Sequence, residues 1–242
     1  MLPDYRFAPI NKDSLYVFPL FQMGDNVVQN GMARRLAAHY PHISWLAKHD
    51  FFSDVSRMFS DIKNLTVVNG YNYLEARTFY RDRVSRQLPI GFCGYLDDAW
   101  APTQFDEDIY RESGIPFDHR WKSFSLPPDL LPPRTGVRPT EILVHESPAR
   151  EVLIDPSRLP PGAIGYVIPI TPRPSFWDWL PEIYGAAEIH CVDSSYLNLV
   201  ESLYAMGFLK DTKLVFHKYS KIRRYGLGAG APILRAPWTI LT

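Results

Sequence analysis

Two short polar segments follow apolar runs of the chain: the early one carries a carboxylate that can act as a base, and the late one carries hydroxyl residues that suit the binding of an anion. The early segment is Gly24-Asp25-Asn26, the late one is Asp193-Ser194-Ser195, and an amphipathic stretch follows each. Small hydroxyl residues that open a helix leave its first N–H groups exposed, so the positive end of the helix dipole can hold a phosphate or diphosphate. In the early segment, Gly24 permits close approach of the backbone. Helix capping is the alternative for both segments, because Asp, Asn and Ser commonly serve as caps.

The elements that carry the early segment alternate between strand and helix. Residues 15–21 are apolar and β-prone, and apolar residues between 27 and 37 recur at helical spacing. Further strands are predicted at 42–47, 64–69 and 89–96, and further helices at 50–62 and 73–87. This alternation predicts a parallel sheet with crossover helices, which is a Rossmann-like half.

A proline-dense stretch at 126–139 separates this half from a second one. The alternation then resumes, with strands predicted at 141–146, 151–155, 163–170, 187–193 and 212–218 and helices at 175–186 and 195–206. We therefore expect an α/β protein with two Rossmann-like halves, residues 1–125 and 140–242, that face each other across a cleft. The last residues are candidates for packing back on the N-terminal half. The Gly-rich stretch 225–232 is interpreted as a loop, because it lacks the strand-to-helix context of a dinucleotide fingerprint.

Composition gives no support to a polyanionic partner and no sign of a membrane segment. The 242 residues contain 26 Lys plus Arg and 26 Asp plus Glu, so no global field attracts nucleic acid. The beginning of the chain lacks the pattern of a signal peptide, and no apolar run reaches the ~20 residues of a membrane span. Cys93 and Cys191 lie in apolar contexts that suit buried thiols in a reducing compartment. The expected location is the cytoplasm.

Several motifs together resemble one protein family. They are GDN at 24–26, IPFxxRW at 115–121, EILVHESPAR at 141–150 and IHCxDSS at 189–195. In this order they look like a family of small bacterial and viral glycosyltransferase-like proteins. The resemblance implies a fold of the GT-B type, made of two Rossmann-like domains, and a nucleotide sugar linked to UDP, GDP or ADP as co-substrate.

The early turn is also similar to that of heptosyltransferase-like enzymes of the same fold. In these enzymes the Asp of the turn is proposed as the base that deprotonates the acceptor hydroxyl. By this analogy Asp25 is the catalytic base, and Asp193, Ser194 and Ser195 hold the donor diphosphate. The residues on the acceptor side are then Gly24, Asn26 and Asn30. The sequence departs from that family at Ser195 and Asn198, near which the family carries Gly and His.

Sugar transfer also needs positive charge or N–H donors at the departing diphosphate. Arg120 and Arg150 are candidates, because a guanidinium matches two phosphate oxygens, and Lys218 follows a predicted strand. The alternatives are a structural ion pair for Arg120 and solvated surface positions for Arg150 and Lys218.

Other polar and aromatic residues can complete a donor site. His145 and His190 end apolar strands, where imidazoles can bond a sugar or nucleotide hydroxyl, and Glu146 is a candidate ribose acceptor. Core histidines and an exposed turn carboxylate are the alternatives. Three tryptophans offer faces for stacking or belong to the core: Trp121, Trp177 and Trp179.

The leading hypothesis is a nucleotide-sugar-dependent glycosyltransferase that acts on a hydroxyl of a glycan or small acceptor. No obligatory metal or other cofactor is expected, because helix N-termini and cations can take the leaving-group charge. One alternative is a phage-type DNA glycosyltransferase for hydroxymethylated pyrimidines, for which the basic and aromatic stretch 218–226 is the candidate contact. A second alternative is a nucleotide-sugar-binding subunit without catalysis.

Overall fold

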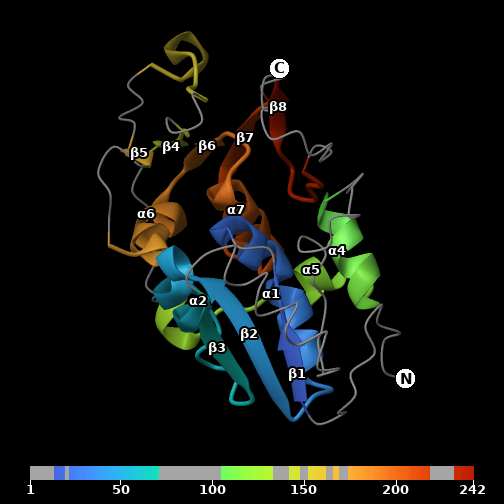
Figure 1. Cartoon of the computed structure of the whole chain (residues 1–242). Coiled ribbons are helices and arrows are strands. Elements are labelled where there is room, and N and C mark those ends of the chain that lie inside the picture. Colours follow the sequence, from blue (N-terminus) through green and yellow to red (C-terminus); the bar gives the residue numbers. More distant parts are fainter. Residues whose placement is uncertain are drawn as a thin grey trace. The chain divides into compact units, whose positions relative to one another are not determined.

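The computed structural model describes residues 14–19, 22–70, 105–132, 142–147, 152–161, 166–168, 174–218 and 232–242. The chain divides into two compact units, one formed by Met1–Pro128 with Gly228–Ala231 and one by Asp129–Leu227 with Pro232–Thr242 (Figure 1). The division between Pro128 and Asp129 falls inside the predicted connection at 126–139. Both units contain a parallel sheet with helices, so the predicted α/β class is confirmed.

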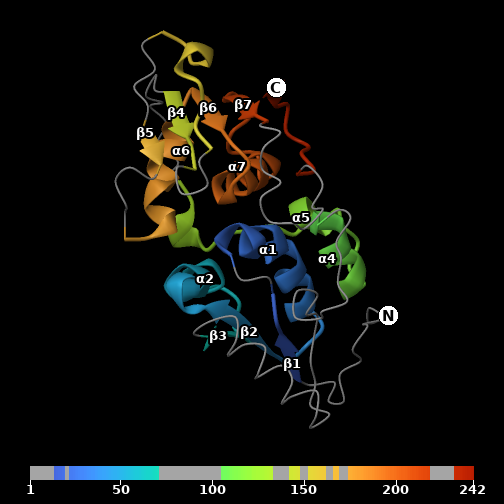
Figure 2. The ribbon, with the colours of Figure 1, turned by 45° about the horizontal axis from the view of Figure 1, so that its top comes forward.

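The first unit is built on a parallel three-stranded sheet in the order β1-β2-β3. Its elements are β1 (Ser14–Val17), α1 (Met23–Ala37), β2 (His42–Lys48), η1 (His49–Phe51), α2 (Phe52–Met58) and β3 (Leu65–Gly70). Neighbouring strands joined by right-handed crossovers place both helices on one face of the sheet, as Figure 2 shows. The core between these layers contains Trp45 and Met32, both fully buried.

Two further helices pack against α1 at very short range. They are α4 (Phe105–Ser113) and α5 (His119–Lys122), and a short 3-10 turn, η3 (Pro128–Leu130), follows. A Cβ atom at Gly31 would lie 2.0 Å from the backbone oxygen of His119, so only glycine fits there. The buried Tyr110 hydroxyl donates to the backbone oxygen of Val28 at 2.8 Å and accepts from the Met32 N–H at 3.2 Å. These contacts fix α4 and α5 on α1.

The second unit contains a parallel five-stranded sheet in the order β5-β4-β6-β7-β8. Its strands are β4 (Ile142–His145), β5 (Tyr166–Ile168), β6 (Glu188–Cys191), β7 (Lys213–His217) and β8 (Thr239–Leu241). The chain goes outward from β4 to β5 and returns to the other side of β4 at β6. The strand order therefore reverses between β4 and β6, which is the topological switch point of this sheet.

The two faces of this second sheet are covered differently. On one face lies α7 (Ser195–Ala205), whose Tyr196 ring packs on His145, and the unit also contains η6 (Phe176–Trp179) and α6 (Leu180–Gly185). On the other face, the segment 152–161 with η5 (Pro156–Arg158) packs Val152 and Ile154 on Val144 of β4. Over β6, β7 and β8 the same face carries polar side chains.

Several sequence-based boundaries differ from the structure. The strand predicted at 15–21 ends at Val17, and α1 begins at Met23, so residues 24–26 form the first helical turn rather than a loop before it. Residues 151–155 were expected as a strand, but Val152 makes only an isolated antiparallel bridge to Ser147. The helix predicted at 73–87 and the strand predicted at 89–96 lie outside the described residues.

The end of the chain pairs with the second sheet. Residues 232–242 belong to the second unit, where β8 pairs with β7. The carboxylate of Glu201, in the middle of α7, accepts hydrogen bonds from the Arg235 and Ala236 N–H groups and from the Trp238 indole at 2.6, 3.2 and 2.8 Å. Glu201 therefore holds the segment that leads into β8.

Candidate functional site

The carboxyl ends of β4 and β6 bring together the predicted donor-binding residues of the second unit. His145 ends β4 and is paired in register with Cys191 of β6, and the Val192 N–H donates to the His145 backbone oxygen at 3.2 Å. The imidazole of His145 is 6% exposed, and its ring centroid lies 4.8 Å from that of Tyr196. His145 thus lies at the switch point, directly beside the first turn of α7.

The late polar segment forms the amino end of α7. Ser194 is the N-cap, and its hydroxyl accepts from the Leu197 N–H at 3.2 Å, so the predicted capping is present. Asp193 and Ser195 flank it and are half-buried. The positive end of an 11-residue helix is therefore directed to the carboxyl edge of the sheet, where open α/β sheets bind their ligands.

Two more residues that were predicted to bind the donor lie at this edge, and one of them is more exposed than the other. Lys218 follows β7 and is exposed, and its backbone N–H donates to the Leu241 oxygen at 2.8 Å. Glu146 follows β4, but its carboxylate accepts from the Ile154 N–H at 2.7 Å and so holds the segment after it. Arg150 lies outside the described residues.

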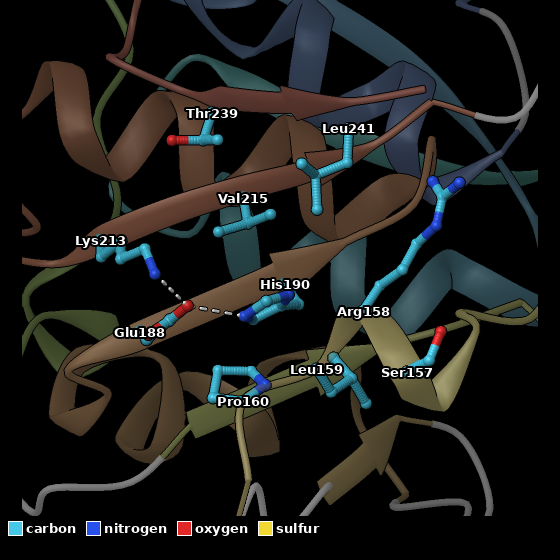
Figure 3. Close-up of a pocket in the computed structure, with 10 residues that line it drawn as sticks. All are labelled: Ser157, Arg158, Leu159, Pro160, Glu188, His190, Lys213, Val215, Thr239 and Leu241. Atoms are coloured by element: carbon cyan, nitrogen blue, oxygen red, sulfur yellow. Dashed lines mark hydrogen bonds and ion pairs between the residues drawn. The ribbon is translucent and has the colours of Figure 1, made fainter.

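His190 does not lie at the carboxyl edge but on the polar face of the sheet. It is 2% exposed, and its ring nitrogens lie 2.8 Å from Glu188 Oε1 and 2.8 Å from His217 Nε2. Lys213 Nζ lies 2.8 Å from the same oxygen of Glu188, so Lys213, Glu188 and His190 form one chain of contacts, as the dashed lines in Figure 3 show. Burial lowers the pKa of His190 despite the opposing effect of Glu188, and it lowers the pKa of His217 to about 4.

This polar chain lines a groove that sequence reasoning missed. Its volume is about 320 Å³, and β6, β7, β8 and η5 contribute its walls. The sequence carried a signal for it, because EIHC in β6 alternates polar and apolar residues, and Lys213 and His217 at the two ends of β7 fall on the same side of that strand. Such alternation is typical of a sheet with one solvated face, whereas parallel strands covered on both faces are continuously apolar.

In the first unit, the residues predicted on the acceptor side make contacts that stabilise the fold. Asp25 is at the third position of α1, and its Oδ2 accepts from the Gln22 N–H at 3.0 Å in a capping box. Asn26 is fully buried, donates to the Gln22 oxygen at 2.9 Å and accepts from the Trp45 indole at 2.9 Å. Gly24 is buried in the same turn. Asp25, which is half-buried, is therefore the more accessible of these side chains.

Asn30 and Arg120 have structural environments. The amide of Asn30 is fully buried and bonds both the N–H and the oxygen of Ser125, each at 3.1 Å. Arg120 is fully buried, forms an ion pair with Asp106 and belongs to the first unit. This favours the structural alternative for Arg120 over a role in donor binding. The three tryptophans named as stacking candidates are 2–6% exposed and belong to the core: Trp121, Trp177 and Trp179.

The carboxyl edge of the first sheet carries polar residues that were not predicted. Lys48 ends β2, and its Nζ lies 2.5 Å from Asp50 Oδ2. Asn69 of β3 lies 3.2 Å from the Nδ1 atom of His49. The polar run KHD directly after a buried strand was the signal for this edge. Lys48 and Asn69 lie in the last residues of β2 and β3, and Asp25 follows β1, so all of them belong to the carboxyl edge of this sheet, where open parallel sheets bind ligands.

No family model matches the chain, and no curated protein or solved structure matches it either. Among the described residues, no cluster of three or more His, Cys, Asp or Glu side chains is placed to hold a metal ion. The described helices include none with the length and apolar character needed to cross a bilayer.

Proposed function

We propose that the protein is a nucleotide-sugar-dependent glycosyltransferase whose second unit binds the donor. The observation that carries the proposal is the switch point between β4 and β6, where His145 lies beside the amino end of α7. Ligands of open parallel sheets bind at this position, and the helix dipole favours a diphosphate there. The transfer chemistry comes from the resemblance of the GDN, IPFxxRW and IHCxDSS motifs, which also motivates the proposed GT-B arrangement.

The proposed roles follow from position and charge. The amino end of α7 with Ser194 and Ser195 stabilises the leaving diphosphate, and exposed Lys218 adds positive charge at the same edge. The imidazole of His145 bonds a hydroxyl of the donor. Asp25 is the proposed base for the acceptor hydroxyl, and its position beside β1 places it at the corresponding edge of the first sheet.

The donor half of the proposal is tested by calorimetry with UDP-, GDP- and ADP-sugars. We expect one nucleotide to bind, and Lys218→Gln to weaken its affinity about tenfold because a charge-assisted contact is lost. Lys210→Gln is the matched control, since Lys210 is an exposed lysine of the same unit that lies before β7. Excess chelator should leave the affinity unchanged. If none of the nucleotide sugars binds, the proposal fails.

The catalytic half is tested with Asp25→Asn. The amide oxygen of Asn can still accept the Gln22 N–H, so the capping contact and the fold should be retained. Loss of a general base typically slows a reaction by a factor of about 10² to 10⁴, so transfer should fall while donor affinity stays. Equal turnover by the variant would remove Asp25 from the mechanism.

One observation favours a second candidate, a nucleotide-sugar-binding subunit without catalysis. The Asp25 carboxylate already serves the capping box of α1, as a purely structural residue would. Under this candidate a nucleotide sugar raises the melting temperature of the wild-type protein, but the donor is neither hydrolysed nor transferred. Duplex DNA as acceptor stays an alternative that salt-sensitive DNA binding would support. No DNA binding at low ionic strength would discard it.

A further inference from the structure

Three rings from three different elements meet at the switch point of the second sheet. The Tyr196 ring, in the first turn of α7, lies with its centroid 4.8 Å from that of the His145 imidazole at the end of β4, and the two planes are tilted by 58°. The same ring stacks on Phe176, the first residue of η6, with centroids 4.4 Å apart and 25° between the planes. Aromatic pairs in such contact stabilise each other beyond the effect of their buried area. Tyr196 therefore connects His145 to a second, separate element.

The Tyr196 ring is itself fixed by a hydrogen bond. Its hydroxyl donates to the Phe176 backbone oxygen at 3.1 Å. The backbone at this point is held by a capping box, in which the Ser175 hydroxyl accepts from the Trp177 N–H at 3.2 Å and the Asp178 carboxylate accepts from the Ser175 N–H at 3.1 Å. Because Tyr196 is anchored in α7 through its backbone and on η6 through its hydroxyl, its ring has little freedom to rotate.

His145 has a fixed backbone, but its orientation depends on its side-chain contacts. It pairs with Ile168 of β5 and Cys191 of β6, and its oxygen accepts from the Val192 N–H at 3.2 Å. An imidazole on a fixed backbone can still adopt several rotamers. The Tyr196 ring packs against the His145 imidazole and so restricts these rotamers. A side chain that binds a ligand has to be held to within about 0.5 Å, and the packing of neighbouring residues provides this precision.

We infer that Tyr196 is a positioning residue, which holds the His145 imidazole in the orientation that bonds a hydroxyl of the donor. The inference rests on the proposed function, because it gives Tyr196 a role in nucleotide-sugar binding that acts through His145. A tyrosine that serves packing alone would contribute to the stability of the fold, but its effect on donor affinity would not depend on His145.

The test is a double-mutant cycle, measured by calorimetry with the UDP-, GDP- and ADP-linked forms of glucose. Tyr196→Leu should weaken donor affinity about tenfold, as should His145→Ala, because each variant loses the same hydrogen bond to the donor. In the double variant, Tyr196→Leu should cause no loss beyond that of His145→Ala, since the residue through which it acts is absent. All measurements are made below the melting temperatures of the variants.

Three further variants sharpen the test. Tyr196→Phe keeps the ring and should recover most of the affinity that Tyr196→Leu loses. Phe176→Leu removes the stacked ring but keeps the backbone oxygen, so it should weaken binding less than Tyr196→Leu, and only where His145 is present; it supplies the cycle if Tyr196→Leu does not fold. Tyr204→Leu is the matched control, because Tyr204 is a half-buried tyrosine at the other end of the same helix. Its substitution should leave donor affinity unchanged.

The possible failures can be told apart. If the wild-type protein binds none of the three nucleotide sugars, the inference falls together with the proposed function. If the wild type binds one of them and Tyr196→Leu binds it equally well, the inference alone is overturned. The same holds if Tyr196→Leu causes an equal loss with and without His145, because Tyr196 would then act independently of the imidazole.

Discussion

The two units bury polar residues in different ways. In the first unit, Asn26, Asn30 and Tyr110 are fully buried, and each bonds backbone or side-chain groups of its own unit. In the second unit, Glu188 and His190 bond each other but also line a groove. A buried polar residue therefore indicates a binding site only when its surroundings include space for a ligand. The first set makes the contacts that tie α1 to its neighbours, and the second set borders a groove of about 320 Å³.

The largest test of this comparison is Gly31→Ala in the first unit. The added Cβ would lie 2.0 Å from the His119 backbone oxygen, and backbone cannot move away as a flexible side chain can. We expect α5 to separate from α1 and the free energy of unfolding to fall by about 3 kcal/mol. Urea denaturation measures this loss.

Arg35→Ala is the control for this substitution. It lies on the same helix, it is half-buried, and its change should alter stability by less than about 0.5 kcal/mol. If Gly31→Ala were as stable as the control, α4 and α5 would not be held on α1 by close contact.

A smaller effect is expected from Glu201→Gln in the second unit. The carboxylate is 1% exposed and accepts from Arg235, Ala236 and Trp238, whereas the amide of Gln replaces one acceptor oxygen by a donor. The substitution should cost about 2 kcal/mol and detach the segment before β8. Hydrogen exchange of the Arg235 and Ala236 amides reports this directly, and both should lose protection.

Ser202→Ala separates a local effect from a general loss of stability. Its hydroxyl lies on the same helix and donates only to the Asn198 oxygen at 2.8 Å, so exchange at Arg235 and Ala236 should be unchanged. Protected amides in Glu201→Gln would mean that β8 is positioned by its pairing with β7 alone.

Short stretches of the sequence were sufficient to predict the α/β class, because the alternation of strand and helix patterns can be recognised without knowing any tertiary contact. Alternating apolar strands and amphipathic helices predicted most of the elements that the described residues form. The bonding partners of Asn30 and Arg120, Ser125 and Asp106, were not predictable, because tertiary packing brings these residues together. The strand β8 was missed because three residues after a proline carry little periodicity. The groove was missed because the polar residues of β6 and β7 were interpreted only as parts of strands, and the face on which they lie was not considered.

Acidification gives the smallest expected effect and tests whether the polar face is open. The pKa of His217 is about 4 in the folded protein, and burial also lowers that of His190, whereas an unfolded histidine titrates near 6.5. A lowered folded pKa means that the unfolded chain takes up protons first, so stability is complete above pH 6.5 and falls as the pH drops toward 4. We expect a loss of about 2 kcal/mol between these two pH values.

The variant His217→Gln isolates this contribution, because its side-chain amide can still donate to His190 Nδ1 but does not titrate. Chemical denaturation at several pH values should show a smaller acid-induced loss in the variant. Glu188 acts in a lower window, since hydrogen bonds from Lys213 and His190 outweigh burial and lower its pKa below 4.5. Its contribution is therefore lost only below that pH. If wild type and variant lost the same stability between pH 6.5 and 4.5, the histidines would be as accessible to protons as in the unfolded chain, and the contrast between the two units would disappear.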